Sequence, residues 1–187
     1  MKYDKTFLRN KFLLQRKKKY LKAKNFNFNF NLIFNLIRKH FYKKTITIAA
    51  YYPSYYEVNI LNFIKLASKK NFRIVLPVLK SSNKMCFKKW IFNEPLYVNK
   101  FGILEPDNSK KEIIPDLVLV PLVAFDNSLN RIGYGKGYYD RFLKKHKKNK
   151  KNPLTIGLAF SFQKYKKIPT SKHDVKLDYI LTEKGIF

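Results

Sequence analysis

The apolar stretch DLVLVPLVAF, residues 116–125, constrains the fold of this chain more than any other feature. The nine residues after its aspartate are uninterruptedly apolar. A strand with one face in water would instead alternate apolar and polar side chains. The stretch therefore predicts a strand that is buried on both faces of a sheet, and similar strands are predicted at 45–52, 72–78, 154–160 and 177–182.

Helical patterns separate these predicted strands. A basic helix is expected over 3–23, and two further helices are expected over 55–68 and 137–146. Residues 28–42 begin with a strand-like alternation, but the later spacing in LIFNLI favours a helix. Strands that alternate with helices are typical of a mainly parallel sheet covered on both faces. We therefore predict an α/β fold and, from the length, a single domain over 1–187.

The composition is strongly basic, with 40 Lys+Arg against 12 Asp+Glu and a net charge of +28. Such a charge indicates anionic partners: nucleic acid, an acidic membrane, or phosphates. Codon bias explains it equally well, because A/T-rich codons favour Lys together with Asn, Ile, Phe and Tyr. The single cysteine, Cys86, fits a reducing compartment. With no secretory signal and no apolar run near the ~18 residues of a membrane span, we expect a cytoplasmic protein.

The stretch RIGYGKGYYD, residues 131–140, holds three of the six glycines in the chain. It follows the strongest predicted strand, and ligands of parallel sheets bind at the carboxyl ends of strands. Gly133, Gly135 and Gly137 are expected to adopt positive φ angles and to let a ligand approach the backbone. Their N–H groups and the start of the following helix would then bind an anion. The alternative is a purely structural turn, because short glycine motifs often occur without a ligand.

Charged residues near this turn suit a phosphate-bearing ligand. Arg131 can grip two phosphate oxygens, Lys136 adds a point charge, and Asp140 could hold Mg²⁺. Lys5 and Arg9 are four residues apart, so they share one helix face and could reach the same polyphosphate. The alternative for both is an ordinary solvated surface charge.

Two further carboxylates are candidate site residues. Glu57 follows a predicted strand and could open a helix, where it would bind an amine or amide of a substrate. The alternative is a first-turn glutamate that interacts only with the helix dipole. Asp174, in HDVKLD before the last predicted strand, is either a second metal ligand or a loop acid.

Taken together, these motifs resemble those of the 5-formyltetrahydrofolate cyclo-ligase family. The resemblance rests mainly on LVLVPLVAFD followed by RIGYGKGYYDRFL, and KTFLR, YYPSYYEV, FGILEP, IGLAF and HDVKLD occur in the family's order. It extends over nearly the whole chain. It implies a three-layer α/β/α fold similar to the isomerase and CoA-transferase group. It also implies cyclisation of 5-formyltetrahydrofolate to 5,10-methenyltetrahydrofolate with ATP and Mg²⁺, releasing ADP and phosphate.

The resemblance implies a role for each matching residue. The residues expected to bind ATP are Lys5, Thr6, Phe7, Leu8, Arg9, Arg131, Ile132, Gly133, Tyr134, Gly135, Lys136, Gly137, Tyr138 and Tyr139. Those expected to bind the folate are Tyr52, Glu57, Tyr134, Gly135, Lys136, Gly137 and Tyr138. Asp140 and Asp174 are expected to hold Mg²⁺, and Lys136 and Arg131 to stabilise charge on the transferred phosphoryl group. One departure is Ile60, where family members often carry threonine, so that a hydroxyl near Glu57 is lost.

Two alternative functions are consistent with the same residues. The net charge and the many aromatic residues would suit nucleic-acid binding, although no RRM, KH or zinc-ribbon pattern is present. The other alternative is an inactive relative that binds folate or nucleotide. We expect a monomer with no specific nucleic-acid partner and no membrane, whose basic surface would favour polyglutamylated folate because that tail is anionic.

Overall fold

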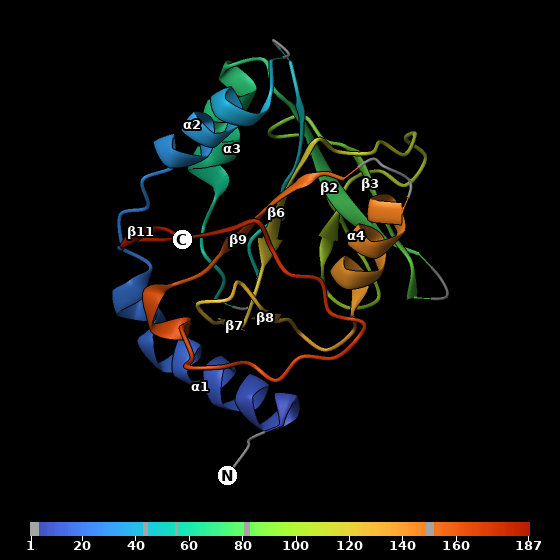
Figure 1. The fold of residues 1–187 in the computed structure, drawn as a ribbon. Coiled ribbons are helices and arrows are strands. Elements are labelled where there is room, and N and C mark those ends of the chain that lie inside the picture. The colour runs from blue at the N-terminus through green and yellow to red at the C-terminus, as the bar shows by residue number, and fades with distance from the viewer. Residues whose placement is uncertain (1–3, 43–44, 55, 81–82, 149–151) are drawn as a thin grey trace.

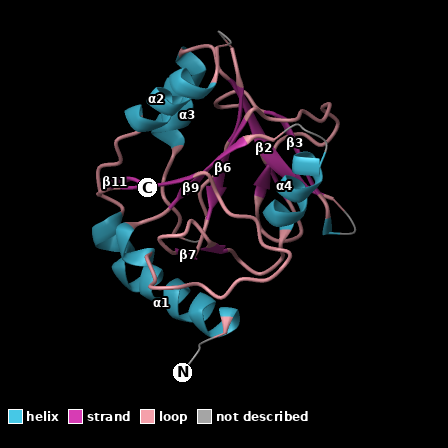
Figure 2. Ribbon diagram, in the orientation of Figure 1, coloured by secondary structure: helices cyan, strands magenta, loops and turns pink. Residues whose placement is uncertain are grey.

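The computed structural model describes residues 4–42, 45–54, 56–80, 83–148 and 152–187. Expectations that fall on residue 3, on residue 55 or on 149–151 lie outside these described residues. The path of the chain is shown in Figure 1, and its helices and strands are distinguished in Figure 2.

A seven-stranded sheet forms the centre of the molecule, in the order β11-β10-β9-β6-β1-β2-β3. The strands are β1 (Thr47–Ala49), β2 (Arg73–Leu79), β3 (Met85–Lys89), β6 (Leu117–Pro121), β9 (Leu154–Leu158), β10 (Tyr179–Thr182) and β11 (Gly185–Ile186). The five strands from β10 to β2 pair in parallel, and β11 and β3 are antiparallel at the two edges. The predicted mainly parallel sheet is confirmed.

In the described part of the chain, four α-helices pack around the sheet: α1 (Lys5–Ala23), α2 (Asn31–His40), α3 (Leu61–Lys69) and α4 (Tyr138–Lys148). Helices α2 and α3 lie together on one side of the sheet and α4 lies on the other, which gives the predicted three layers (Figure 1). Helix α1 packs at the end of the sheet, against the short strands β7 (Ala124–Phe125) and β8 (Arg131–Ile132). The helix favoured for residues 28–42 is confirmed as α2.

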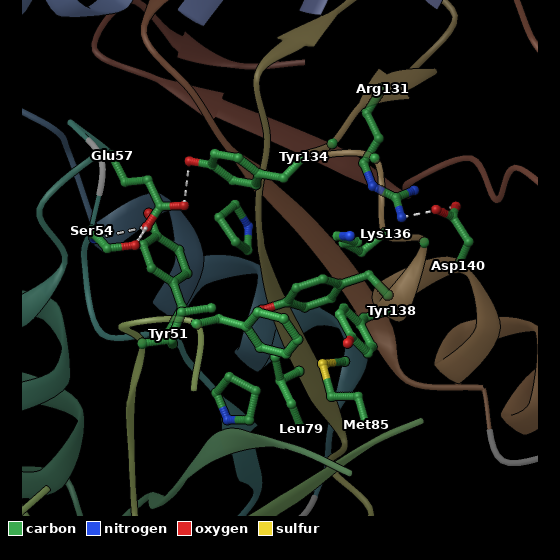
Figure 3. Close-up of a pocket in the computed structure, with 18 of the residues that line it drawn as sticks. Tyr51, Ser54, Glu57, Leu79, Met85, Arg131, Tyr134, Lys136, Tyr138 and Asp140 are labelled. Atoms are coloured by element: carbon green, nitrogen blue, oxygen red, sulfur yellow. Dashed lines mark hydrogen bonds and ion pairs between the residues drawn. The ribbon is translucent and has the colours of Figure 1, made fainter. Parts of the chain in front are cut away.

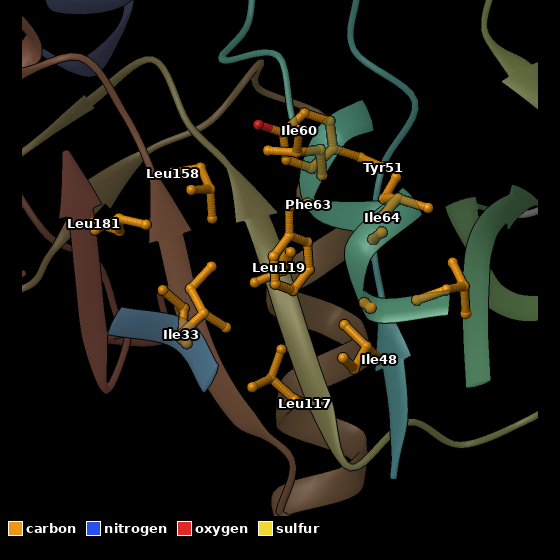
Figure 4. Packing of buried hydrophobic residues seen from close by; sticks show 14 of the residues in the cluster. Ile33, Ile48, Tyr51, Ile60, Phe63, Ile64, Leu117, Leu119, Leu158 and Leu181 are labelled. Carbon is orange, nitrogen blue, oxygen red and sulfur yellow. The ribbon is translucent and has the colours of Figure 1, made fainter. Parts of the chain in front are cut away.

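The apolar core has two sides because successive side chains of a strand point to opposite faces. In β6, Leu117 and Leu119 pack on the side of α3 and its buried Phe63 (Figure 4). The intervening residues Val118 and Val120 pack on the side of α4. Burial on both faces explains why this stretch of sequence is apolar without alternation.

The apolar stretch 116–125 is not one strand, however. β6 ends at Pro121, and β7 begins at Ala124 and pairs with β8 in a separate antiparallel ladder. The side-chain amide of Gln163 donates to the carbonyl oxygens of Leu122 and Val123, at 3.0 and 2.8 Å. These two carbonyl groups thus receive their hydrogen bonds from a side chain about 40 residues away and not from a neighbouring strand of the sheet. The pairing of β6 with β9 ends just before them, at Pro121.

The predicted helix over 55–68 begins later than expected, at Leu61. Glu57 does not open it, because the Glu57 N–H donates to the Ser54 carbonyl at 2.9 Å and closes a turn before the helix. Tyr56 has a φ of 64°, which is not helical. Ile60 is fully buried in the N-cap position and makes no side-chain cap bond there. Asn59 Oδ1 instead accepts from the Leu61 N–H at 3.0 Å.

Candidate functional site

A cavity of about 540 Å³ opens at the carboxyl edge of the sheet. Tyr51 and Tyr52 reach it from the loop after β1, Leu79 from the end of β2, and Pro121 from the end of β6. The glycine turn and the first turns of α1 complete it. This is where parallel sheets hold their ligands, since loops from neighbouring strands converge there.

Most of the predicted site residues line this cavity. They are Lys5, Arg9, Tyr52, Glu57, Arg131, Ile132, Gly133, Tyr134, Gly135, Lys136, Gly137, Tyr138, Tyr139, Asp140 and Asp174. Thr6, Phe7 and Leu8 are not among its lining residues. The helix turns them away: Lys5 and Arg9 are four residues apart on one face, whereas Leu8 is fully buried in an apolar cluster with Ile132.

The glycine turn leads directly into α4, as predicted. Gly135 and Gly137 have φ angles of 99° and 64°, which side-chain-bearing residues rarely adopt. The expectation was wrong for Gly133, which is not among the glycines with positive φ. Gly133 therefore has no conformational need for glycine, and a methyl group there would meet nothing within 4 Å.

Helix α1 directs two cations at the site, and one of them supports the glycine turn. Arg9 Nε donates to the Gly133 carbonyl at 2.8 Å. A Cβ on Gly135 would lie 3.2 Å from Arg9 Cζ, so the turn and the guanidinium are in close contact. Lys5 forms an ion pair with Asp174. The predicted cationic face of α1 is thus directed at the site.

Arg131 and Asp140 form an ion pair at the other wall of the cavity, with Nη2 to Oδ1 at 2.9 Å (Figure 3). Arg131 is 8% exposed, and its Nη1 also donates to the Val175 carbonyl at 2.6 Å. Asp140 Oδ1 accepts from the Val175 N–H at 3.0 Å. Both residues are therefore held by the segment that carries Asp174.

The two predicted metal ligands, Asp140 and Asp174, line the same cavity. Across the residues that the structure describes, no group of three or more His, Cys, Asp or Glu could hold a metal ion. Mg²⁺ does not need such a group, because it is usually bound by one or two carboxylates together with substrate phosphates. Asp140 and Asp174 fit that pattern. Each also faces a cation, and the hydrogen bonds from Lys5 and Ser171 outweigh burial and keep the pKa of Asp174 below its usual range.

Glu57 lies across the cavity from the Arg131–Asp140 ion pair, and 6% of its surface is exposed (Figure 3). The Tyr134 hydroxyl donates to Glu57 Oε1 at 2.7 Å, and the Ser54 N–H donates to Oε2 at 2.9 Å. Burial raises the pKa of Glu57, although these hydrogen bonds and the charge of Arg16 act in the opposite direction. Burial also raises the pKa of Tyr51, Tyr134 and Tyr139.

Several residues of the site were missed by sequence reasoning. Arg16, which lies behind the cavity and not in its lining, had a usable signal, since it lies seven residues after Arg9 and so continues the same helix face. An apolar wall is formed by Pro77, Leu79, Met85, Phe101, Ile103 and Leu104. The last three belong to FGILEP, which supported the family resemblance but was given no role in the site. The last residues of the wall belong to the hairpin of β4 (Tyr97–Val98) and β5 (Leu104–Glu105), where buried Glu105 accepts from the Leu79 N–H at 2.8 Å.

Fold and site together define an α/β protein whose ligands bind at the carboxyl edge of a parallel sheet. One side of the cavity is cationic and rich in backbone N–H groups, which suits an anion. The other side presents a buried carboxylate, which suits a ligand that donates hydrogen bonds. Comparison with known proteins narrows this class. The model of the 5-formyltetrahydrofolate cyclo-ligase family matches residues 1–183. The chain belongs to the 5-formyltetrahydrofolate cyclo-ligase family, as its motifs predicted.

Relatives from several bacteria share most of the chain. The 5-formyltetrahydrofolate cyclo-ligase of Haemophilus influenzae is 34% identical over 153 residues, which cover 79% of each chain. That of Mycoplasma genitalium is 33% identical over 193 residues, covering 95% of this chain and 97% of its own. The structure of a 5,10-methenyltetrahydrofolate synthetase from Aquifex aeolicus matches with a TM-score of 0.77 at 31% identity, covering 97% of this chain and 91% of that one.

No helix in the described part of the chain combines the length and the apolar character needed to cross a membrane.

Proposed function

We propose that this protein converts 5-formyltetrahydrofolate to 5,10-methenyltetrahydrofolate, with cleavage of ATP to ADP and phosphate and with Mg²⁺ as the metal. One observation carries the proposal: a single cavity of about 540 Å³ joins Glu57 to the glycine turn and its cations. Pockets of this size hold small-molecule substrates. A phosphate donor and a folate could therefore meet inside it.

The chemistry consists of two displacements. The formyl oxygen attacks the γ-phosphorus of ATP, the bond to the bridging oxygen breaks, and ADP leaves. Nitrogen 10 of the folate then attacks the activated formyl carbon and loses its N–H proton to water, and the carbon–oxygen bond breaks to release phosphate. Neither step needs a protein nucleophile, because phosphoryl transfer depends on positioning and on electrostatic stabilisation.

The residues of the glycine turn and of α1 would bind the nucleotide. Lys136 lies on the exposed tip of the turn, between the two glycines of positive φ. There its ammonium group would stabilise the charge on the phosphoryl group during transfer. Arg131 would add its charge at the base of the turn, held in place by Asp140. Lys5 and Arg9 would contact the outer phosphates from the helix.

Glu57 and Tyr52 would bind the folate. The carboxylate of Glu57 points into the cavity, where it can accept hydrogen bonds from the amine and amide groups of the pterin ring (Figure 3). The apolar wall formed by Leu79, Met85 and Phe101 would cover the aromatic part of the substrate.

Asp140 and Asp174 would hold Mg²⁺. Their oxygen donors match the preference of this metal, and the phosphates of the nucleotide would supply further ligands. When bound, the metal supplies positive charge that neutralises the phosphate oxygens. The protein residues orient these groups through the contacts of Asp140 with Arg131 and of Asp174 with Lys5.

The direct test is turnover. Purified protein is mixed with 5-formyltetrahydrofolate, ATP and Mg²⁺, and the methenyl chromophore and ADP are followed together. We expect equal amounts of both products, and neither product when ATP or Mg²⁺ is omitted. A folded sample, checked by circular dichroism, that binds ligand without producing either product would overturn the proposal in favour of an inactive relative.

The net charge of +28 favours one second candidate, nucleic-acid binding. It predicts RNA binding that weakens steeply with added salt, in a protein without folate turnover. A gel-shift titration at two salt concentrations beside the turnover assay separates the two functions.

A cytoplasmic location, a monomeric state and a preference for polyglutamylated folate stay predictions. The basic composition supports the last of these, since a polyglutamate tail is anionic.

A further inference from the structure

Arg16 is a buried cation beneath the site. It lies on α1, is 1% exposed, and does not line the cavity itself. Its Nη1 donates to the Leu122 carbonyl at 3.3 Å, and its guanidinium lies 5.4 Å from the centre of the Tyr134 ring. A guanidinium keeps its charge in proteins, so burying one is costly unless its partners use that charge.

The hydrogen bonds from Arg16 run in one direction. A guanidinium can only donate, so the Tyr134 oxygen must accept the bond from Arg16 Nη2, at 2.6 Å. The single proton of the Tyr134 hydroxyl is then directed to Glu57 Oε1, at 2.7 Å. The Ser54 N–H occupies Oε2. Both oxygens of Glu57 therefore receive a donor, which favours the ionised carboxylate.

We propose that Arg16 is a positioning residue that acts through the Tyr134 hydroxyl: it orients this hydroxyl toward Glu57 and so holds Glu57 as an ionised carboxylate that points into the cavity. The functional part of this inference rests on the proposed function, in which Glu57 binds the folate. The same helix face also carries Arg9, which contacts the glycine turn at Gly133. Helix α1 would thus align the nucleotide side and the folate side of the cavity.

The surroundings of Glu57 support this assignment. Among the residues that the structure describes, the groups that act on Glu57 electrically or by hydrogen bonds include Ser54, Tyr51, Tyr134, Tyr139 and Arg16. The three tyrosines stay neutral, because burial raises the pKa of each. Arg16 supplies the positive charge in this group. Although 38% of Tyr134 is exposed, its hydroxyl lies between Arg16 and Glu57, so that the contact is shielded from solvent.

The test is the pH profile of kcat/KM for 5-formyltetrahydrofolate in Arg16→Met, with Lys18→Met as the control. Lys18 is an exposed cation of the same helix, so this control removes the same charge at a distance from the cavity. Loss of Arg16 makes Glu57 easier to protonate, so the acidic limb should move to higher pH. At pH 7 the KM for the folate should rise roughly tenfold or more, since a buried charge partner is lost. The KM for ATP should stay within about twofold.

Conservative variants separate positioning from a purely structural role. Arg16→Lys keeps the charge and should restore part of the acidic limb. Tyr134→Phe removes the hydroxyl and should move the limb in the same direction as Arg16→Met. Because part of the effect of Arg16 passes through Tyr134, Arg16→Met should have a smaller effect in Tyr134→Phe than in wild type, and the remainder is the direct action of the Arg16 charge on Glu57. Full additivity, or an unmoved acidic limb in Arg16→Met, would overturn the proposal. If Arg16→Met does not fold, Arg16→Lys and Tyr134→Phe decide the question in the same way.

A second measurement does not depend on turnover. The chain has five glutamates, so the Glu57 carboxyl can be assigned by carbon-13 NMR through its absence in Glu57→Gln. Its titration should move to higher pH in Tyr134→Phe and in Arg16→Met, and stay unchanged in Lys18→Met. An inactive wild-type protein would remove the proposed function alone, whereas an identical Glu57 titration in all variants would remove the role of Arg16.

Discussion

Lys136 is the cation of the glycine turn whose removal gives the simplest test of the proposed phosphoryl transfer. Its side chain is exposed at the cavity, and its backbone carbonyl accepts from Arg141 Nη2 at 2.6 Å, which holds the turn without the lysine side chain. Lys136→Ala should therefore leave stability unchanged but lower kcat about 10²–10³-fold, the usual cost of one lost electrostatic contact in a transition state. Steady-state kinetics check this, with the exposed Lys65→Ala of α3 as control. Undiminished turnover would remove Lys136 from the mechanism.

Glu57 also has a consequence for stability, because burial raises its pKa in the folded state. The folded protein then binds this proton more tightly than the unfolded chain does. As pH rises from the unfolded value of about 4.3 through the higher folded value, the contribution of Glu57 to the free energy of unfolding should fall and then level off.

Urea unfolding of wild type and Glu57→Gln across this pH range measures the effect. The difference in free energy of unfolding, wild type minus variant, should decrease with rising pH. A difference that increases would show that the folded-state pKa is lowered instead.

At the scale of the element, the glycine turn separates two roles of glycine. Gly135 has a φ of 99° and Arg9 beside it, so Gly135→Ala should cost roughly 1–2 kcal/mol of stability and displace the guanidinium. Gly133 has open space beside it and no positive φ, so Gly133→Ala should leave stability unchanged. Urea unfolding of both variants tests this pair.

The KM for ATP adds a further comparison for the same two variants. A higher KM in Gly133→Ala, at unchanged stability, would show that the nucleotide occupies the space beside that residue. Equal losses of stability in both variants would contradict the difference in their backbone conformations.

At the scale of the whole molecule, the net charge of +28 acts on both stability and substrate capture. Like charges repel in the compact state, and salt screens this repulsion over a Debye length of about 10 Å at 0.1 M. The melting temperature should therefore rise between low and moderate NaCl concentrations, while the KM for ATP rises because attraction of the anion is screened. A melting temperature that falls with salt would show that attractive ion pairs dominate instead.

Much of the fold follows from local patterns. The apolar strands and intervening helices predict the parallel sheet, because strands that are buried on both faces are typical of sheets covered by helices. In such a sheet the loops at the carboxyl ends of the strands form the ligand site. The spacing of Lys5 and Arg9 likewise predicts their shared face, because helical geometry is local. The break after Pro121 has a local signal in the proline itself, which cannot donate to a strand ladder. The partner that accepts the chain beyond it, Gln163, is not indicated by residues 116–125.

The sequence by itself determined the class of fold, the glycine turn and the cationic face of α1, because each depends on residues a few positions apart. Only the tertiary structure decided how Glu57 is used. Its bond to Tyr134 spans 77 positions, and the bond from Tyr134 to Arg16 spans 118. Such contacts depend on how the sheet brings distant loops to one edge, and the carboxylate, the hydroxyl and the guanidinium gain their direction only when packing removes them from water.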